Sequence, residues 1–145
     1  MKNFWQWTFF TVVGSIIGGF IAGFIGIWFS AINQRRQAKI AFLVTLSELK
    51  QDPLFTKNPK QFRAASLEQL RGAIGRVMPF LKTSSRSDLS KCWEYYQQVN
   101  PDNLDDSYAK AVVRSYCESL GMEVRTDPAK ILPLFFKKFE DIVGR

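Results

Sequence analysis

An uncharged and strongly apolar stretch fills the N-terminal part of the chain. No residue between Asn3 and Ile32 is charged, and residues 9–29 include twelve Phe, Ile or Val side chains. About 20 residues of α-helix cross the hydrocarbon layer of a bilayer, and twelve such side chains favour insertion by roughly 4 to 7 kcal/mol. The pattern therefore predicts a transmembrane helix from about Trp7 to Phe29, within a membrane anchor of residues 1–32.

Tryptophan and basic side chains flank this stretch. Indole rings favour the headgroup region at both membrane surfaces, and basic side chains are concentrated on the cytoplasmic side. The predicted membrane-interface anchors are Trp5, Trp7, Trp28, Arg35, Arg36 and Lys39. The three basic residues after the stretch outnumber Lys2 before it, which favours a cytoplasmic C-terminal domain in a plasma or bacterial inner membrane. The reversed orientation stays open as an alternative, because this excess of charge is small.

A cleavable signal peptide is the competing interpretation of the same stretch. Its apolar run is longer than the ~7–15 residues of a signal-peptide core. Phe29, Ser30 and Ala31 also make a poor small-x-small cleavage site. Both features favour a retained single-pass anchor.

Small residues recur every four positions within the predicted span, from position 14 to position 30. Small side chains let two helix backbones approach closely in lipid, where dispersion and Cα–H···O contacts drive association. Glycine is common in spanning helices, but five positions at constant spacing exceed that background. The predicted helix–helix interface consists of Gly14, Ser15, Gly18, Gly19, Ala22, Gly23 and Gly26. We expect a homo-oligomer or a complex with the helix of another membrane protein.

Residues 33–145 alternate between amphipathic stretches and breaks. Residues 30–50 contain no Gly or Pro, so we expect the helix to continue past the membrane, with Ile40 to Leu46 forming a central core helix. Asp52-Pro53 ends it, because the residue before proline avoids the α region, and Asn58-Pro59 supplies an N-cap and a first-position proline for the next helix. Apolar residues at three- and four-residue spacing define its buried stripe: Leu67, Leu70, Ile74, Val77 and Leu81.

Three more helices are predicted after this one. Residues 82–88 are polar and serine-rich, which indicates a connection before a helix with the stripe Leu89, Cys92, Trp93, Tyr96 and Val99. A loop at residues 100–106 precedes a helix from Ser107 to Leu120, stopped by Gly121, with Tyr108, Val112, Tyr116 and Leu120 facing inward. The last helix is expected from Pro133 to Val143, because Pro133 should break an earlier start; Phe135, Phe136 and Phe139 anchor it.

These elements predict an all-α fold, in which one N-terminal transmembrane helix continues into a small four- or five-helix soluble bundle of residues 33–145. The two cysteines, Cys92 and Cys117, lack the spacing of a metal or redox site and are interpreted as buried thiols. A disulfide between them is the alternative if the orientation is reversed.

Catalytic chemistry finds little support in the sequence. The chain has no histidine, which removes the commonest general base and the usual zinc sites, and it has no phosphate-binding loop motif. Asp102, Asp105 and Asp106 do not match a calcium loop, and we interpret them as loop solvation and a helix N-cap. We therefore predict a non-enzymatic protein without metal or cofactor.

Positive charge is concentrated between residues 57 and 86, a segment that contains seven basic residues and one acidic residue, Glu68. The predicted contacts to an anionic surface are Lys57, Lys60, Arg63 and Arg71. No aromatic platform accompanies them, so lipid headgroups are favoured over nucleic acid, and an ordinary solvated surface is the simplest interpretation. The leading hypothesis is a membrane-anchored interaction or assembly module. The alternatives are a pore-forming or membrane-perturbing effector and a membrane-tethered binder of nucleic acid or anionic lipid.

Overall fold

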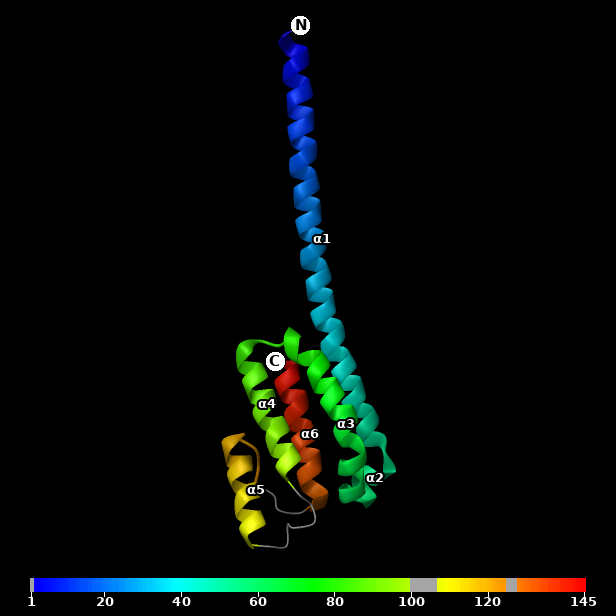
Figure 1. Ribbon diagram of the computed structural model, residues 1–145, viewed down its shortest axis with the longest axis vertical. Helices are drawn as coiled ribbons and strands as arrows, with labels where there is room; N and C mark the ends of the chain where they lie inside the picture. Colours follow the sequence, from blue (N-terminus) through cyan, green and yellow to red (C-terminus); the bar gives the residue numbers. More distant parts are fainter. Residues whose placement is uncertain (1, 100–106, 125–127) are drawn as a thin grey trace. The chain divides into compact units, whose positions relative to one another are not determined.

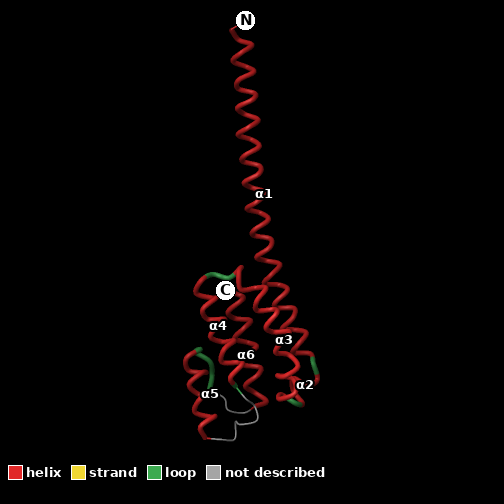
Figure 2. Tube along the Cα trace, viewed as in Figure 1, coloured by secondary structure: helices red, strands yellow, loops and turns green. Residues whose placement is uncertain are grey.

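A computed structural model describes the backbone of residues 2–99, 107–124 and 128–145, and the side chains of residues 8–99, 110–124 and 130–145. Over these residues the chain contains helices and no strand (Figures 1 and 2), which confirms the predicted all-α class with an apolar N-terminal helix ahead of a bundle. The elements are α1 (Lys2–Gln51), α2 (Pro53–Lys57), α3 (Pro59–Val77), the 3₁₀ helix η1 (Met78–Phe80), α4 (Thr83–Gln98), α5 (Ser107–Ser119) and α6 (Pro128–Gly144).

The chain divides into two compact units at Arg36 and Gln37. Unit 1 ends at Arg36 and, over its described residues, is the first part of α1. Unit 2, Gln37–Arg145, is a helical bundle with its own core. As predicted, α1 is not interrupted between the apolar stretch and Gln51.

Two side-chain caps lie at the breaks that the sequence predicted at Asp52-Pro53 and Asn58-Pro59, and the short helix α2 between them was not predicted. The carboxylate of Asp52 accepts a hydrogen bond from the Leu54 N–H at 2.8 Å, and Pro53 occupies the first turn. The Asn58 side chain accepts from the Gln61 N–H at 3.2 Å at the start of α3. Each cap satisfies a backbone donor that has no partner inside the helix.

Gly121 ends α5 as predicted. Its φ is +62°, a left-handed conformation that glycine adopts without steric cost. The Gly121 N–H donates to the Glu118 carbonyl at 3.1 Å, and the Met122 N–H donates to the Cys117 carbonyl at 2.7 Å. This pair of bonds is a Schellman motif, which satisfies carbonyls of the last helical turn.

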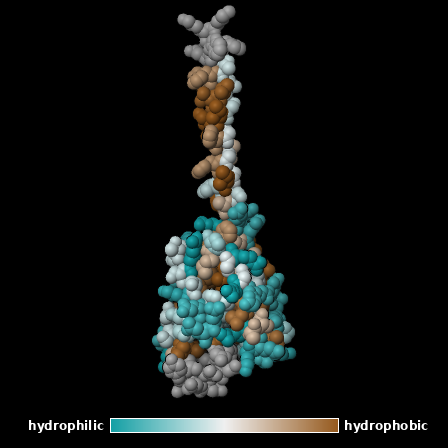
Figure 3. Space-filling model, viewed as in Figure 1, coloured by the Kyte–Doolittle hydropathy of each residue, from teal (hydrophilic) through white to brown (hydrophobic). Residues whose placement is uncertain are grey.

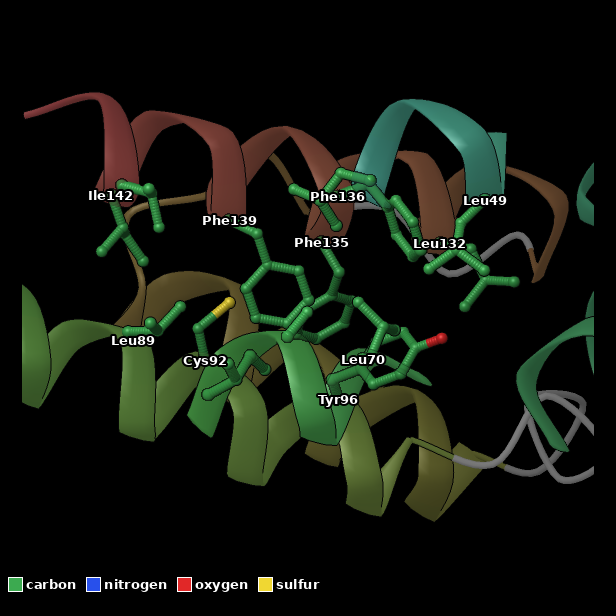
Figure 4. Close-up of a cluster of buried hydrophobic side chains, with 14 of the residues drawn as sticks. Leu49, Leu70, Leu89, Cys92, Tyr96, Leu132, Phe135, Phe136, Phe139 and Ile142 are labelled. Atoms are coloured by element: carbon green, nitrogen blue, oxygen red, sulfur yellow. The ribbon is translucent and has the colours of Figure 1, made fainter. Parts of the chain in front are cut away.

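The core of unit 2 lies mainly between α4 and α6, which form the most extensive helix pair. Figure 4 shows Tyr96 of α4 beside the phenyl rings of α6. The Tyr96 ring contacts those of Phe135, Phe136 and Phe139 at centroid distances of 5.7–6.2 Å, all edge-on. Phe136 also contacts Phe55 of α2, which joins the short helix to the same core. Such pairs contribute about 0.5–1.5 kcal/mol each beyond the burial of their area.

The prediction that Ile40 to Leu46 forms the central helix was wrong. Phe42, Leu46 and Leu49 are buried, but Ile40 and Val44 are about half exposed. This part of α1 therefore covers one side of the bundle, and α6 is the central helix. The physical reason is the width of the apolar surface: α6 buries apolar side chains at Ile131, Leu132, Phe135, Phe136, Phe139, Ile142 and Val143, whereas α1 buries a single stripe.

The predicted connection at residues 82–88 is shorter than expected, because α4 already begins at Thr83. Ser85 is buried in its first turn. The Arg86 guanidinium donates to the carbonyls of Leu81 at 2.8 Å and Pro79 at 2.7 Å. These bonds fix the preceding turn against the start of α4, where the N-cap residue Lys82 makes no side-chain capping bond.

The inward face of α5 is rotated by about one residue from the prediction. Val113, Cys117 and Leu120 are buried, while Val112 and Tyr116 are half-buried; the Tyr108 side chain lies outside the described residues. Tyr116 stacks on Tyr95 at 4.2 Å, and its hydroxyl donates to the Gln98 side chain. At the edge of the core, Tyr116 packs its ring on Tyr95 and keeps its hydroxyl hydrogen-bonded.

Pro133 does not break the last helix, which begins at Pro128 and runs through it. Proline removes one hydrogen bond and crowds the carbonyl four residues earlier. Here Pro133 is exposed, and that carbonyl belongs to the first turn of α6. Ile131 and Leu132, which directly precede Pro133, are buried, and their burial offsets the loss.

Candidate functional site

The apolar part of α1 in unit 1 is exposed along its whole described length. Phe20, Phe24 and Ile27 each expose more than 70% of their surface. Among the described residues, α1 is the one helix long and apolar enough to cross a membrane by length and composition, and its most apolar window is not buried at all. A continuous apolar surface of this size requires cover by lipid or protein.

The small residues of this helix lie on one side of it. Residues four apart on an α-helix are neighbours on its surface, and Figure 3 shows a pale strip beside the brown apolar surface. A Cβ built on any of these glycines would meet no atom of another side chain or element within 4 Å. The fold of the chain therefore does not require glycine at Gly14, Gly18, Gly19, Gly23 or Gly26. We call the predicted interface, these glycines with Ser15 and Ala22, the small-residue face.

The polar group of this face is satisfied inside its own helix. The Ser15 hydroxyl donates to the Thr11 carbonyl at 2.8 Å. In hydrocarbon an unsatisfied hydroxyl is costly, and this local bond removes the cost without a partner helix. Ser15 therefore belongs to the small-residue face because its side chain is small, and its hydroxyl is not available as a donor to a partner helix.

The predicted membrane-interface anchors that the structure describes lie along α1. Trp28 is exposed and makes an edge-on contact with Phe29 at 6.3 Å. Arg35 and Arg36 are exposed, whereas Lys39 is half-buried in unit 2. Trp5 and Trp7 belong to α1, but their side chains lie outside the described residues.

Of the four basic residues predicted to contact an anionic surface, Arg63 is engaged inside unit 2. Its guanidinium donates to the carbonyls of Tyr96 at 3.4 Å and Gln97. Both carbonyls belong to the last turn of α4, where they have no intrahelical donor. Arg63 is therefore a C-cap for another helix and favourably placed at the negative end of its dipole.

We expect Arg63→Met to lower the free energy of unfolding by about 1–2 kcal/mol, because two carbonyls lose a charged donor while the apolar stem is retained. Urea denaturation of the full chain in mild detergent would measure it. Arg71→Met is the matched control, since Arg71 is exposed on the same helix, and it should change stability by less than about 0.5 kcal/mol. Equal losses for the two variants would contradict the capping role.

The other three basic residues are exposed. Lys57 is the last residue of α2, Lys60 lies in the first turn of α3, and Arg71 lies two to three turns further along α3. All three lie at least 20 positions after Gln37, the first residue of unit 2. Their positions on α2 and α3 do not indicate which ligand, if any, they bind.

Ser66, which the sequence did not single out, forms a buried polar contact with Tyr96 of the predicted stripe. The Ser66 and Tyr96 hydroxyls lie 3.4 Å apart, and both residues are buried. Burial raises the pKa of Tyr96 above its ordinary value, so it remains a neutral hydroxyl. A serine one turn before Leu70 of the predicted stripe was the available indication, but serine is too common on solvated faces to be diagnostic.

Both cysteines are buried thiols. Burial raises the pKa of the Cys92 thiol to about 12, and the positive charge of Lys138 opposes this shift only in part. A thiol in this state is a poor nucleophile at neutral pH, because the thiolate is the reactive form. Cys92 is therefore a packing residue of α4.

The described residues contain no group of acidic, cysteine or histidine side chains arranged to hold a metal ion. Asp102, Asp105 and Asp106 lie outside the described residues. A pocket of about 170 Å³ lies between the α5–α6 connection and α6, with Glu123, Lys137, Lys138 and Asp141 in its lining. It is smaller than typical ligand sites of about 300–1,000 Å³, and its charges are mixed.

The geometry thus defines a class: an α-helical chain with one exposed helix of membrane-spanning length, followed by a bundle. Comparison with known proteins finds no matching family model, no similar curated protein and no similar solved structure. The function is therefore argued from the chain itself.

Proposed function

We propose that the protein is a single-pass, membrane-anchored assembly module without enzymatic activity. In this proposal the apolar part of α1 spans a plasma or inner membrane, the small-residue face binds a second copy of the chain, and unit 2 lies on the cytoplasmic side. The observation that carries it is the exposed apolar helix whose glycines have no packing partner in the chain.

The energetic cost of these glycines supports an external partner. Each glycine in a helix interior costs about 0.8–1.0 kcal/mol relative to alanine. The alanine side chain would fit at all five positions of the isolated helix. Close approach of another helix gives glycine a compensating advantage, because a Cβ would hold the two backbones apart.

The alternatives receive less support from the same features. A water-filled pore needs polar groups facing the conduit, but residues 3–32 carry no charge and the Ser15 hydroxyl is bonded within its helix. Arg63 lies within the basic segment 57–71, but its guanidinium caps α4. It is therefore not a contact for nucleic-acid phosphates, which weakens the nucleic-acid alternative. Assembly through the small-residue face requires neither polar groups that line a pore nor a basic surface that includes Arg63.

The anchoring is tested by fractionation of the full chain. We expect it to sediment with membranes and to resist alkaline carbonate extraction. The double variant Ile17→Arg, Ile21→Arg should lose this property, because each central arginine costs roughly 2.5–3.5 kcal/mol and together they cancel the insertion energy. Asn33→Arg with Gln37→Arg adds the same charge outside the span and should remain bound. Recovery of the intact parent chain in the soluble fraction would refute the proposal.

A further inference from the structure

One end of unit 2 combines positive charge with exposed apolar groups. We call it the proximal end, and it carries Gln37 of α1, the last turn of α3, η1, the start of α4 and the C-terminus of α6 (Figure 1). An ion pair of 3.9 Å between Arg145 and Asp88 links α6 to α4 there. The proximal end is therefore a surface built by several helices.

The chain itself holds this end close to the proposed span. Gln37 lies eight positions after Phe29. Eight steps along the chain reach about 12 Å as helix and at most about 29 Å when fully extended. This limit depends on chain length alone, so it applies whatever the orientation of unit 2. Within unit 2, α1 places Gln51 about 21 Å from Gln37, and Lys57 and Lys60 come after Gln51 in the chain.

Basic side chains outnumber acidic ones at the proximal end. The basic residues are Lys39, Arg76, Lys82, Arg86 and Arg145. The acidic residues nearby are Asp88, paired with Arg145, Glu140, paired with Lys50, and Asp141. Arg86 is held over η1 by its bonds to the Pro79 and Leu81 carbonyls. Arg76 bonds with its Nε to the Gly72 carbonyl, which leaves the outer part of its guanidinium for other partners.

Apolar groups accompany these charges in η1. Pro79 is exposed, and Met78 and Phe80 are half-buried. Apolar side chains beside basic ones are typical of surfaces that lie in the headgroup region of a bilayer. A surface for single-stranded nucleic acid would typically add exposed aromatic side chains on which bases stack.

We propose that the proximal end is a docking surface for anionic lipid headgroups, with Arg76 and Lys82 as its principal contacts. This inference rests on the proposed anchoring, and it assigns lipid contact to residues other than Lys57, Lys60, Arg63 and Arg71. Docking holds unit 2 against the leaflet and restricts which of its faces a partner can reach.

A spin label at Ser84→Cys tests the proposal in the full chain. Ser84 is exposed in the first turn of α4, and Thr56→Cys in α2 provides the matched label away from the proximal end. The native cysteines are buried, so the added thiol reacts selectively. The chain is reconstituted in phosphatidylcholine vesicles with or without 30% phosphatidylglycerol, and label depth is measured from collisions with oxygen and a water-soluble nickel chelate.

We expect anionic vesicles to increase the oxygen accessibility of the Ser84 label and to leave the Thr56 label unchanged. Arg76→Gln with Lys82→Gln should shift the docked-to-undocked ratio by roughly 25-fold, since each well-placed basic residue contributes about 1 kcal/mol, or about fivefold. Lys57→Gln with Arg71→Gln removes the same charge and should have little effect.

Three results would overturn the inference. The first is equal oxygen accessibility of the Ser84 label in both vesicle types. The second is a loss of docking in the Lys57→Gln, Arg71→Gln variant as large as in the Arg76→Gln, Lys82→Gln variant. The third is immobilisation of the label by a short single-stranded RNA but not by anionic vesicles. Flotation of the vesicles separates the two proposals. A chain that floats but does not dock contradicts the docking surface alone, whereas a chain that does not float contradicts the anchoring.

Discussion

Gly18→Leu with Ala22→Leu should weaken self-association of the chain in a bilayer by about tenfold or more, because two isobutyl groups replace the smallest side chains at the centre of the small-residue face. Contacts between spanning helices depend on close backbone approach, and interhelical interactions in lipid contribute about 1–2 kcal/mol. Association is measured by energy transfer between labelled chains in vesicles, or by a two-hybrid reporter that responds to dimerisation of spanning helices.

Ile17→Leu is the matched control for this pair. Position 17 lies about 100° around the helix from position 18, at the same depth, and the substitution conserves apolar volume. We expect it to associate as the parent does. Unchanged association of the double variant would show that the face is not an interface, even if the chain is firmly anchored.

Phe136→Ala should lower the free energy of unfolding of unit 2 by about 3–5 kcal/mol. Phe136 is fully buried, and its ring contacts those of Phe55 at 5.2 Å and Phe62 at 5.9 Å as well as Tyr96 and Phe139. Its removal opens a cavity where α2, α3, α4 and α6 meet. A loss of this size is a large fraction of the 5–15 kcal/mol typical of folded domains.

Trp93 provides the measurement, because it is half-buried in unit 2 and stacks on Tyr96 at 5.8 Å. Urea unfolding of the full chain in mild detergent is followed by tryptophan fluorescence, with Trp5, Trp7 and Trp28 of α1 as a constant contribution. Ile40→Ala is the control: Ile40 is 51% exposed, and we expect it to cost less than about 1 kcal/mol. If Ile40→Ala is as destabilising as Phe136→Ala, then α1 and not α6 is the centre of the core.

The sequence by itself determined the helical class and most of the helix boundaries. The exposed apolar helix was predictable because residues 3–32 carry no charge and are too apolar to form a surface in contact with water. The breaks at Asp52-Pro53, Asn58-Pro59 and Gly121 were predictable because caps and left-handed residues act over three or four positions of the chain. The stripe Leu70, Ile74 and Val77 was predictable for the same reason, since helical periodicity is local.

Only the tertiary structure decided which helix is central and how the basic residues are used. Arg63 and Arg86 are ordinary surface charges by sequence, but each satisfies carbonyls at the end of another element. The rotation of α5 by one residue follows from the Tyr95–Tyr116 stack, and the helical turns before Pro133 follow from burial of Ile131 and Leu132. The Arg63 bonds and the Tyr95–Tyr116 stack join residues that are distant in sequence, and the others depend on which faces the bundle buries, so local periodicity and capping rules contain no information about them.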